Sequence, residues 1–105
     1  MATGTLGESE LTENTEVTVY TVPNGKTSTI NIAVCNRNSI AITISLGITT
    51  GVSLINKNYV EYNVSIPPYG ILERSGIVIG QTEKVIARSN SNDVNVRIYG
   101  YEESL

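Results

Sequence analysis

The chain has 105 residues, the size of one domain, and carries a formal net charge of −3 at pH 7. This acidic balance disfavours nucleic acid and anionic membrane surfaces as partners, and no apolar run approaches the ~20 residues that a membrane span needs. Val, Ile and Thr together supply 36 of the 105 residues whereas Ala and Leu supply 10, so the composition favours strands over helices.

Residues 1–14 show neither the period of a strand nor that of a helix. They hold three glutamates and only two large aliphatic side chains, Leu6 and Leu11. We therefore predict a flexible N-terminal arm, ordered by a partner that contacts Leu6 and Leu11, ahead of a β-sandwich domain over residues 15–105. The alternative is a frayed terminus that contacts nothing.

Three strand patterns follow the arm, over residues 15–22, 27–35 and 39–48. In the last of these, every second residue is apolar, which indicates a sheet with one buried face. These apolar residues are Ile40, Ile42, Ile44, Leu46 and Ile48. Turn residues separate the patterns, at Pro23-Asn24-Gly25-Lys26 and at Asn36-Arg37-Asn38. We interpret both turns as structural hairpin turns that set the register of neighbouring strands.

The second half of the chain continues the pattern. We expect a short edge strand near residues 52–54 and a strand over 59–66, with Val60, Tyr62, Val64 and Ile66 facing the core. Two prolines then force a loop, because neither can donate a hydrogen bond to a sheet. Further strands are expected over residues 71–79, with an irregularity near Gly76, and over 83–89 and 93–101.

Seven or eight short strands with turn signals every 8–12 residues are typical of an antiparallel β-sandwich. The short connections leave no room for the helical crossovers of a parallel sheet. The fold class is therefore all-β, and the pattern is compatible with an Ig-like or a jelly-roll-like topology.

The residues that carry most enzyme chemistry are scarce in this sequence. It contains no histidine, which excludes Ser-His-Asp and Cys-His arrangements and the commonest metal ligand. The single cysteine, Cys35, has no disulfide partner, and we expect it to be a half-buried apolar side chain. Glu61 and Glu73 lie where solvated charges are ordinary. We therefore expect no enzymatic activity, no cofactor and no metal.

The aromatic residues are six tyrosines, a residue type that is enriched at protein interfaces. Tyr69 lies in the double-proline loop and is the strongest single candidate for a partner contact. Tyr99 is a second candidate, because it falls on the outward phase of the last strand. The alternative is that the rings pack on the sandwich and only their hydroxyl groups meet water.

Two stretches of the sequence carry distinctive combinations of turn and strand motifs. The first is VYTVPNGKTSTINIAVCNRNSIAITISLGI, with a Tyr-Thr-Val-Pro turn, a Gly-Lys-Thr strand start and a strand that ends in Cys-Asn-Arg. The second is YVEYNVSIPPYGILERSGIVIGQTEKVIARSNSNDVNVRIYGYEE, with Leu-Glu-Arg after a proline loop and a closing Gly-Tyr-Glu-Glu. Together they cover about residues 19–103, most of the chain, and both resemble small virion structural proteins of tailed bacteriophages. This sequence departs from the pattern at Pro67-Pro68-Tyr69, where smaller residues are expected.

The resemblance implies a non-enzymatic particle component. We expect a capsid decoration or cement protein that binds the lattice of the major capsid protein, forms a homo-oligomer and ends in the virion after synthesis in the host cytoplasm. The alternatives are a tail, baseplate or fibre accessory protein that binds other virion proteins, and a β-sandwich module that binds carbohydrate or a cell surface. The sequence shows no secretory signal pattern.

Overall fold

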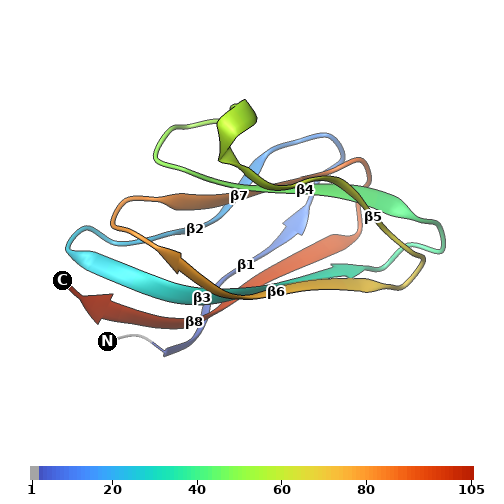
Figure 1. Cartoon of the computed structure of the whole chain (residues 1–105). Coiled ribbons are helices and arrows are strands. Elements are labelled where there is room, and N and C mark those ends of the chain that lie inside the picture. Colours follow the sequence, from blue (N-terminus) through green and yellow to red (C-terminus); the bar gives the residue numbers. More distant parts are fainter. Residues whose placement is uncertain (1–2) are drawn as a thin grey trace.

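The computed structural model describes residues 3–105, which form eight strands and one 3-10 turn (Figure 1). In chain order these are β1 (Thr3–Leu11), β2 (Val17–Thr21), β3 (Lys26–Asn36), β4 (Ile42–Thr49), the 3-10 turn η1 (Asn56–Asn58), β5 (Tyr59–Ile66), β6 (Ile71–Ile79), β7 (Lys84–Ser89) and β8 (Val94–Ser104). The expectation of an all-β antiparallel sandwich is confirmed.

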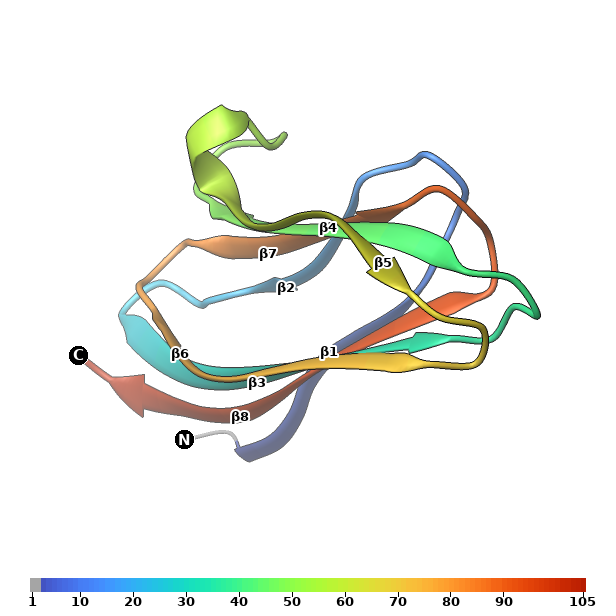
Figure 2. The same cartoon turned by 45° about the vertical axis from the view of Figure 1, so that its right-hand side comes forward.

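The strands form two four-stranded sheets, in the orders β1-β8-β3-β6 and β2-β7-β4-β5. The first strand pairs with the eighth, the second with the seventh, the third with the sixth and the fourth with the fifth. This nested pairing is that of one long hairpin rolled into a sandwich, which is the jelly-roll topology. Of the two topologies that the sequence allowed, the structure therefore has the jelly roll. Figure 2 shows the two sheets as separate layers.

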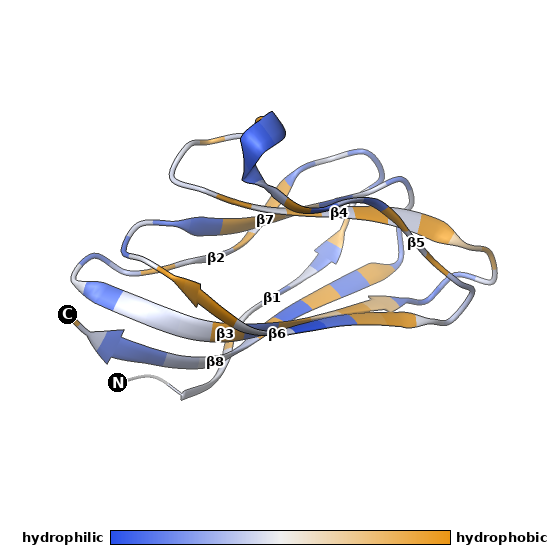
Figure 3. Cartoon of the chain, in the orientation of Figure 1, coloured by the Kyte–Doolittle hydropathy of each residue, from blue (hydrophilic) through white to orange (hydrophobic). Residues whose placement is uncertain are grey.

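Alternating side chains from the two sheets meet in a single core. Its fully buried members include Ile30 and Ile32 of β3, Ile44 and Leu46 of β4, and Ile98 of β8. Figure 3 shows this alternation as bands of hydrophobic and hydrophilic residues along β8. Each fully buried Val, Leu or Ile side chain stabilises the fold by roughly 1.5–3 kcal/mol, so this core is the main source of stability.

The prediction of a flexible N-terminal arm is wrong, because residues 3–11 form the edge strand β1. This strand pairs with β8 from Thr3 to Leu11, and the Leu11 side chain lies in the core at 2% exposure. At Gly7, β1 also passes very close to β2: an added Cβ there would lie 2.3 Å from the backbone oxygen of Val19. Only glycine permits this approach.

The two predicted turns exist, but neither closes a hairpin within one sheet. At the first turn, the Lys26 amide donates a hydrogen bond to the carbonyl oxygen of Pro23 at 3.2 Å, and Gly25 adopts a φ of 79°. The turn leads from β2 to β3, which belong to opposite sheets. The turn after Asn36 likewise leads from β3 to β4 across the sandwich, so both turns connect the layers.

Strand β5 presents the expected face to the core only in its second half, where Ile66 is buried and Val64 packs against the core. Val60 and Tyr62 are exposed, whereas Glu61 lies opposite the buried Leu46. The register of β5 against β4 shifts beside Asn63, whose φ is 49°. Such a bulge exchanges the two faces of the strand, so the residues before Asn63 that were expected to face the core face solvent. Residues 52–54 form no strand, and Ile40, which was expected in the core, is exposed.

The irregularity predicted near Gly76 is confirmed. Gly76 has a φ of 69°, and the register of β6 against β3 shifts between Arg74 and Ile77. The expectation for Cys35 is also met, because its side chain is half-buried on the outer face of β3. In residues 3–105 no helix has the length and apolar character to span a membrane.

Candidate interaction surface

At one end of the sandwich, a single buried asparagine holds two connections together by hydrogen bonds; we call this the locked end. The Asn36 side chain is fully buried, and its amide group donates hydrogen bonds to the carbonyl oxygens of Ile40 at 2.9 Å, Pro67 at 3.0 Å and Ile66 at 3.3 Å. Its Oδ1 accepts from the backbone amide of Asn38 at 2.9 Å. One side chain therefore ties the β3–β4 connection to the β5–β6 connection.

Tyr69 projects from this locked end. Its φ of 55° lies in the left-handed region, which costs a bulky residue of the order of 1–3 kcal/mol unless the surroundings hold it. The surroundings do hold it: the Tyr69 amide donates to Asn38 O at 3.1 Å, and the Gly70 amide donates to Pro67 O at 2.9 Å. Tyr69 nevertheless remains 70% exposed.

Two other large apolar residues are exposed beside Tyr69. Ile71 begins β6 two residues later, and Ile40 lies in the β3–β4 connection, whose carbonyl oxygen Asn36 binds. We call Ile40, Tyr69 and Ile71 the apolar tip. Exposed side chains on a rigid, hydrogen-bonded support lose little conformational entropy on binding, so the apolar tip is suited to protein contact.

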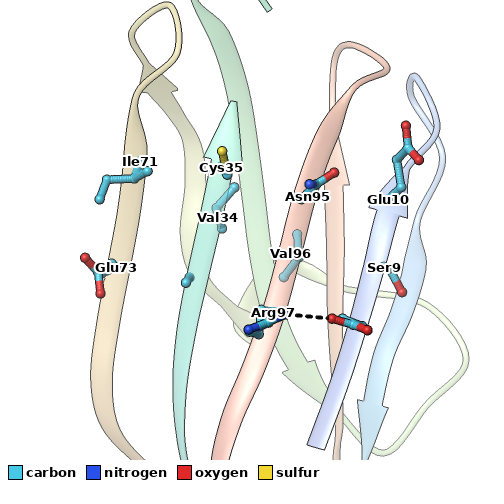
Figure 4. A pocket seen from close by; sticks show the side chains of 11 residues that line it. Ser9, Glu10, Val34, Cys35, Ile71, Glu73, Asn95, Val96 and Arg97 are labelled. Carbon is cyan, nitrogen blue, oxygen red and sulfur yellow. Dashed lines mark hydrogen bonds and ion pairs between the residues drawn. The ribbon is translucent and has the colours of Figure 1, made fainter. Parts of the chain in front are cut away.

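A shallow groove of about 690 Å³ runs along the outer face of the β1-β8-β3-β6 sheet (Figure 4). Its floor lies over β3, where Ala33 and Cys35 have small outward side chains. Ile71 and Glu73 of β6 form one wall. Asn95 and Arg97 of β8, with Glu8 and Glu10 of β1 beyond them, form the other. Ile71 therefore belongs both to the groove and to the apolar tip, which makes the two features continuous.

The groove has an acidic border. Glu8 and Glu10 of β1 both line the groove. Arg97 pairs with Glu8 at 3.1 Å, and Arg37 pairs with Glu10 at 2.5 Å. Within residues 3–105, Glu73 takes part in no ion pair and its side chain is exposed. The groove is therefore apolar at its floor and negative along the β6 wall.

The two free sheet edges next to the apolar tip are β5 and β6. The Arg74 guanidinium of β6 forms an ion pair with the Glu61 carboxylate of β5, which joins the edges of the two sheets. An inward charge and a bulge, as at Arg74 and Gly76, are devices that keep a free edge from pairing with other chains. The side chains of this region are thus better placed for contact than its backbone edge.

The four residues that the sequence suggested as partner contacts differ in how exposed they are in the structure. Leu11 is part of the core, and Leu6 is half-buried and packs against the core. Neither residue is therefore exposed for a partner to contact, although we expected this of residues in a flexible arm. Tyr99 is half-buried on the outer face of β8, where its carbonyl oxygen accepts a hydrogen bond from Asn31 Nδ2 at 3.4 Å. Tyr69 is fully available, and its role as a contact stays a prediction.

Sequence reasoning missed the groove, because its walls come from strands that are distant in the chain. Ala33, Glu73 and Arg97 become neighbours only through the pairing of β3 with both β6 and β8. The signal that could have suggested it is the pair of small residues, Ala33 and Cys35, on the outward phase of a long strand. Among residues 3–105 there is no group of His, Cys, Asp or Glu side chains that could hold a metal ion.

The likeness of this chain to known proteins lies in its structure. No family model matches the chain, and no curated protein matches it. A solved structure of a pentameric capsid protein isolated from metagenomic phage sequences aligns with 96% of this chain at 22% sequence identity and a TM-score of 0.35. The alignment spans 60% of the length of that capsid protein's chain.

Proposed function

We propose that this protein is a non-enzymatic structural component of a bacteriophage virion, a decoration protein that binds the assembled capsid lattice. The proposal starts from the resemblance of its sequence to small virion proteins of tailed phages. The jelly-roll topology is in keeping with it, since this architecture is common in viral capsid proteins, although lectins and cupins share it.

The observation that carries the proposal is the apolar tip. Tyr69 holds a left-handed backbone conformation at the end of a hydrogen-bonded support, and its ring faces solvent. A protein without a binding role gains nothing from a strained, exposed aromatic side chain. An anchor for a partner surface gains a rigid aromatic contact of the kind that dominates protein interfaces.

The test is binding to particles from which the protein is absent. We expect the purified protein to co-sediment with such particles, and Tyr69→Ala to weaken binding by about tenfold, which corresponds to about 1.4 kcal/mol. Tyr101→Ala is the control, because Tyr101 is also an exposed tyrosine but lies near the C-terminal end of β8, paired with Thr3 and away from the apolar tip.

Two results would count against this assignment. Failure of the wild-type protein to bind any particle would remove the virion role. Equal loss of binding in Tyr69→Ala and Tyr101→Ala would remove the apolar tip as its contact. Binding to isolated tails in place of heads would favour the tail, baseplate or fibre alternative.

Carbohydrate binding is the second candidate, and one observation favours it. Tyr59 and Tyr62 form an edge-to-face pair with ring centroids 4.8 Å apart, and the Tyr62 ring is exposed. Exposed tyrosine faces can stack on sugar rings, and lectins include jelly rolls. Binding on a glycan array that Tyr62→Ala abolishes would support this candidate, and an array without signal would remove it.

A further inference from the structure

The connection between β4 and β5, residues 50–58, is the longest in the described chain and projects from the sandwich. It rises from the outer face of the β2-β7-β4-β5 sheet, on the side away from the other sheet (Figures 1 and 2). Val52 is 91% exposed, and Ile55 is also exposed. We call residues 50–58 the knob.

The knob is pinned to the sandwich although its apolar side chains face outward. Leu54 is buried over Gly47, where an added Cβ would lie 2.4 Å from a Leu54 methyl group. Glu16 Oε1 accepts hydrogen bonds from the Ser53 hydroxyl at 2.8 Å and from the Leu54 amide at 3.3 Å. Lys84 Nζ donates to Gly51 O at 3.0 Å. The exposed Val52 is thus held on a fixed support.

The knob and the groove are complementary in charge and shape. Residues 50–58 contain the exposed Lys57 and no acidic residue. At their base, the Lys84 ammonium and the Glu16 carboxylate offset each other in charge. The groove has a floor of small side chains and a border that includes the exposed carboxylate of Glu73. The exposed part of the knob is therefore apolar with the positive charge of Lys57, and the groove offers a floor of small side chains with the negative charge of Glu73 beside it.

We propose that the knob of one copy docks in the groove of a second copy. The inference rests on the proposed function, because a capsid decoration protein is present in many copies that can contact one another. Because the groove and the knob lie on the outer faces of opposite sheets, one copy can use both at once. Such a head-to-tail interface is heterologous, and it generates a closed ring when the rotation between copies completes a circle.

The experiment is sedimentation velocity on the full chain at a series of concentrations and salt concentrations. We expect the wild-type protein to self-associate, and the association to weaken as salt rises because charge attraction contributes to it. Val52→Asp, which disables the knob, and Ala33→Glu, which fills the groove floor with a negative side chain, should each weaken association by about tenfold or more.

Mixing the two variants distinguishes a head-to-tail interface from a symmetric one. Each variant retains one intact surface, so an equimolar mixture should form a one-to-one dimer that cannot grow further. Val78→Asp is the matched control, since Val78 is exposed outside both surfaces. Glu73→Lys is a second groove variant in case Ala33→Glu fails to fold, as judged by its circular dichroism and thermal unfolding.

Three outcomes would overturn the proposal. They are a wild-type protein that stays monomeric at millimolar concentration, a mixture of folded variants that stays monomeric while the wild type associates, and an equal loss of association in Val78→Asp. None of them changes the expected binding of the protein to particles, so failure of the knob-and-groove interface and failure of the virion role remain separate results.

Discussion

Asn36 is the residue on which the geometry of the apolar tip depends. Its buried amide group supplies donors to carbonyl oxygens of two connections, and removal of a buried donor leaves those acceptors without partners. Tyr69 is strained, so it keeps its left-handed conformation only while these connections stay fixed. Stability and the proposed contact are therefore coupled through one side chain.

We predict that Asn36→Asp lowers the free energy of unfolding by about 3 kcal/mol, because a carboxylate cannot donate to the three carbonyl oxygens and is buried beside them. This corresponds to a fall in Tm of about 10–20 °C, measurable by calorimetry. Asn95→Asp is the control: it makes the same chemical change at an exposed site next to Arg37, and its Tm should stay within a few degrees of wild type. Equal shifts in both variants would contradict this role for Asn36.

Tyr20 connects the two sheets through its hydroxyl group. The hydroxyl donates to Glu102 Oε2 at 2.5 Å and shares a 2.7 Å hydrogen bond with the Ser28 hydroxyl. Burial, followed by the hydrogen bond to Glu102, raises the pKa of Tyr20 from 10.0 to about 12. The folded protein therefore favours the neutral phenol, whereas the unfolded chain ionises at the ordinary pKa.

The resulting prediction is a specific loss of stability in alkali. The raised pKa contributes stability that is fully present below pH 10 and is lost as the pH rises towards 12. Two pKa units correspond to roughly 2–3 kcal/mol. Urea unfolding between pH 9 and pH 12 should show this loss, and Tyr20→Phe should show a flatter profile with lower stability at pH 7. An identical slope in the two proteins would rule out Tyr20 as the cause.

At the scale of elements, β1 shows why a strand can escape detection in the sequence. An edge strand needs only one partner, and β8 supplies the ladder of hydrogen bonds along the whole of β1. Few apolar side chains are then required, and Leu6 and Leu11 suffice to attach it to the core. Pattern analysis detects burial, whereas β1 is specified mainly by backbone pairing.

We predict that deletion of residues 1–11 removes most of the stability of the domain, which is about 5–15 kcal/mol for proteins of this kind. The deletion takes Leu11 from the core and exposes the edge of β8. Circular dichroism should show an unfolded or molten chain. Deletion of Leu105, which is exposed at the other terminus, should change Tm little. A truncated chain with a wild-type Tm would show that β1 is dispensable.

Strand positions could be predicted from the sequence for most of the chain, but their partners could not. The alternation in β3, β4 and β8 identified their buried faces, because these strands lie inside their sheets and pair on both sides. Turn residues report only a local reversal of the chain. They cannot distinguish a hairpin from a connection between layers, so the jelly-roll topology emerged only from the structure.

The same limit applies to the candidate surface. Tyr69 could be identified because two prolines and a glycine isolate it in the sequence. Its left-handed backbone and its support by Asn36 depend on contacts across the sandwich. The phase of β5 was wrong for a similar reason: the bulge at Asn63 reverses it, and no residue pattern marks that bulge.

At the scale of the whole molecule, the central claim is that this protein is a component of a phage particle. The most direct measurement is electron microscopy of phage particles purified from the source of this gene and labelled with a gold-tagged antibody against the protein. We predict label spread over the capsid heads in many copies. Label confined to tails would contradict capsid decoration, and particles without any label would contradict the virion role altogether.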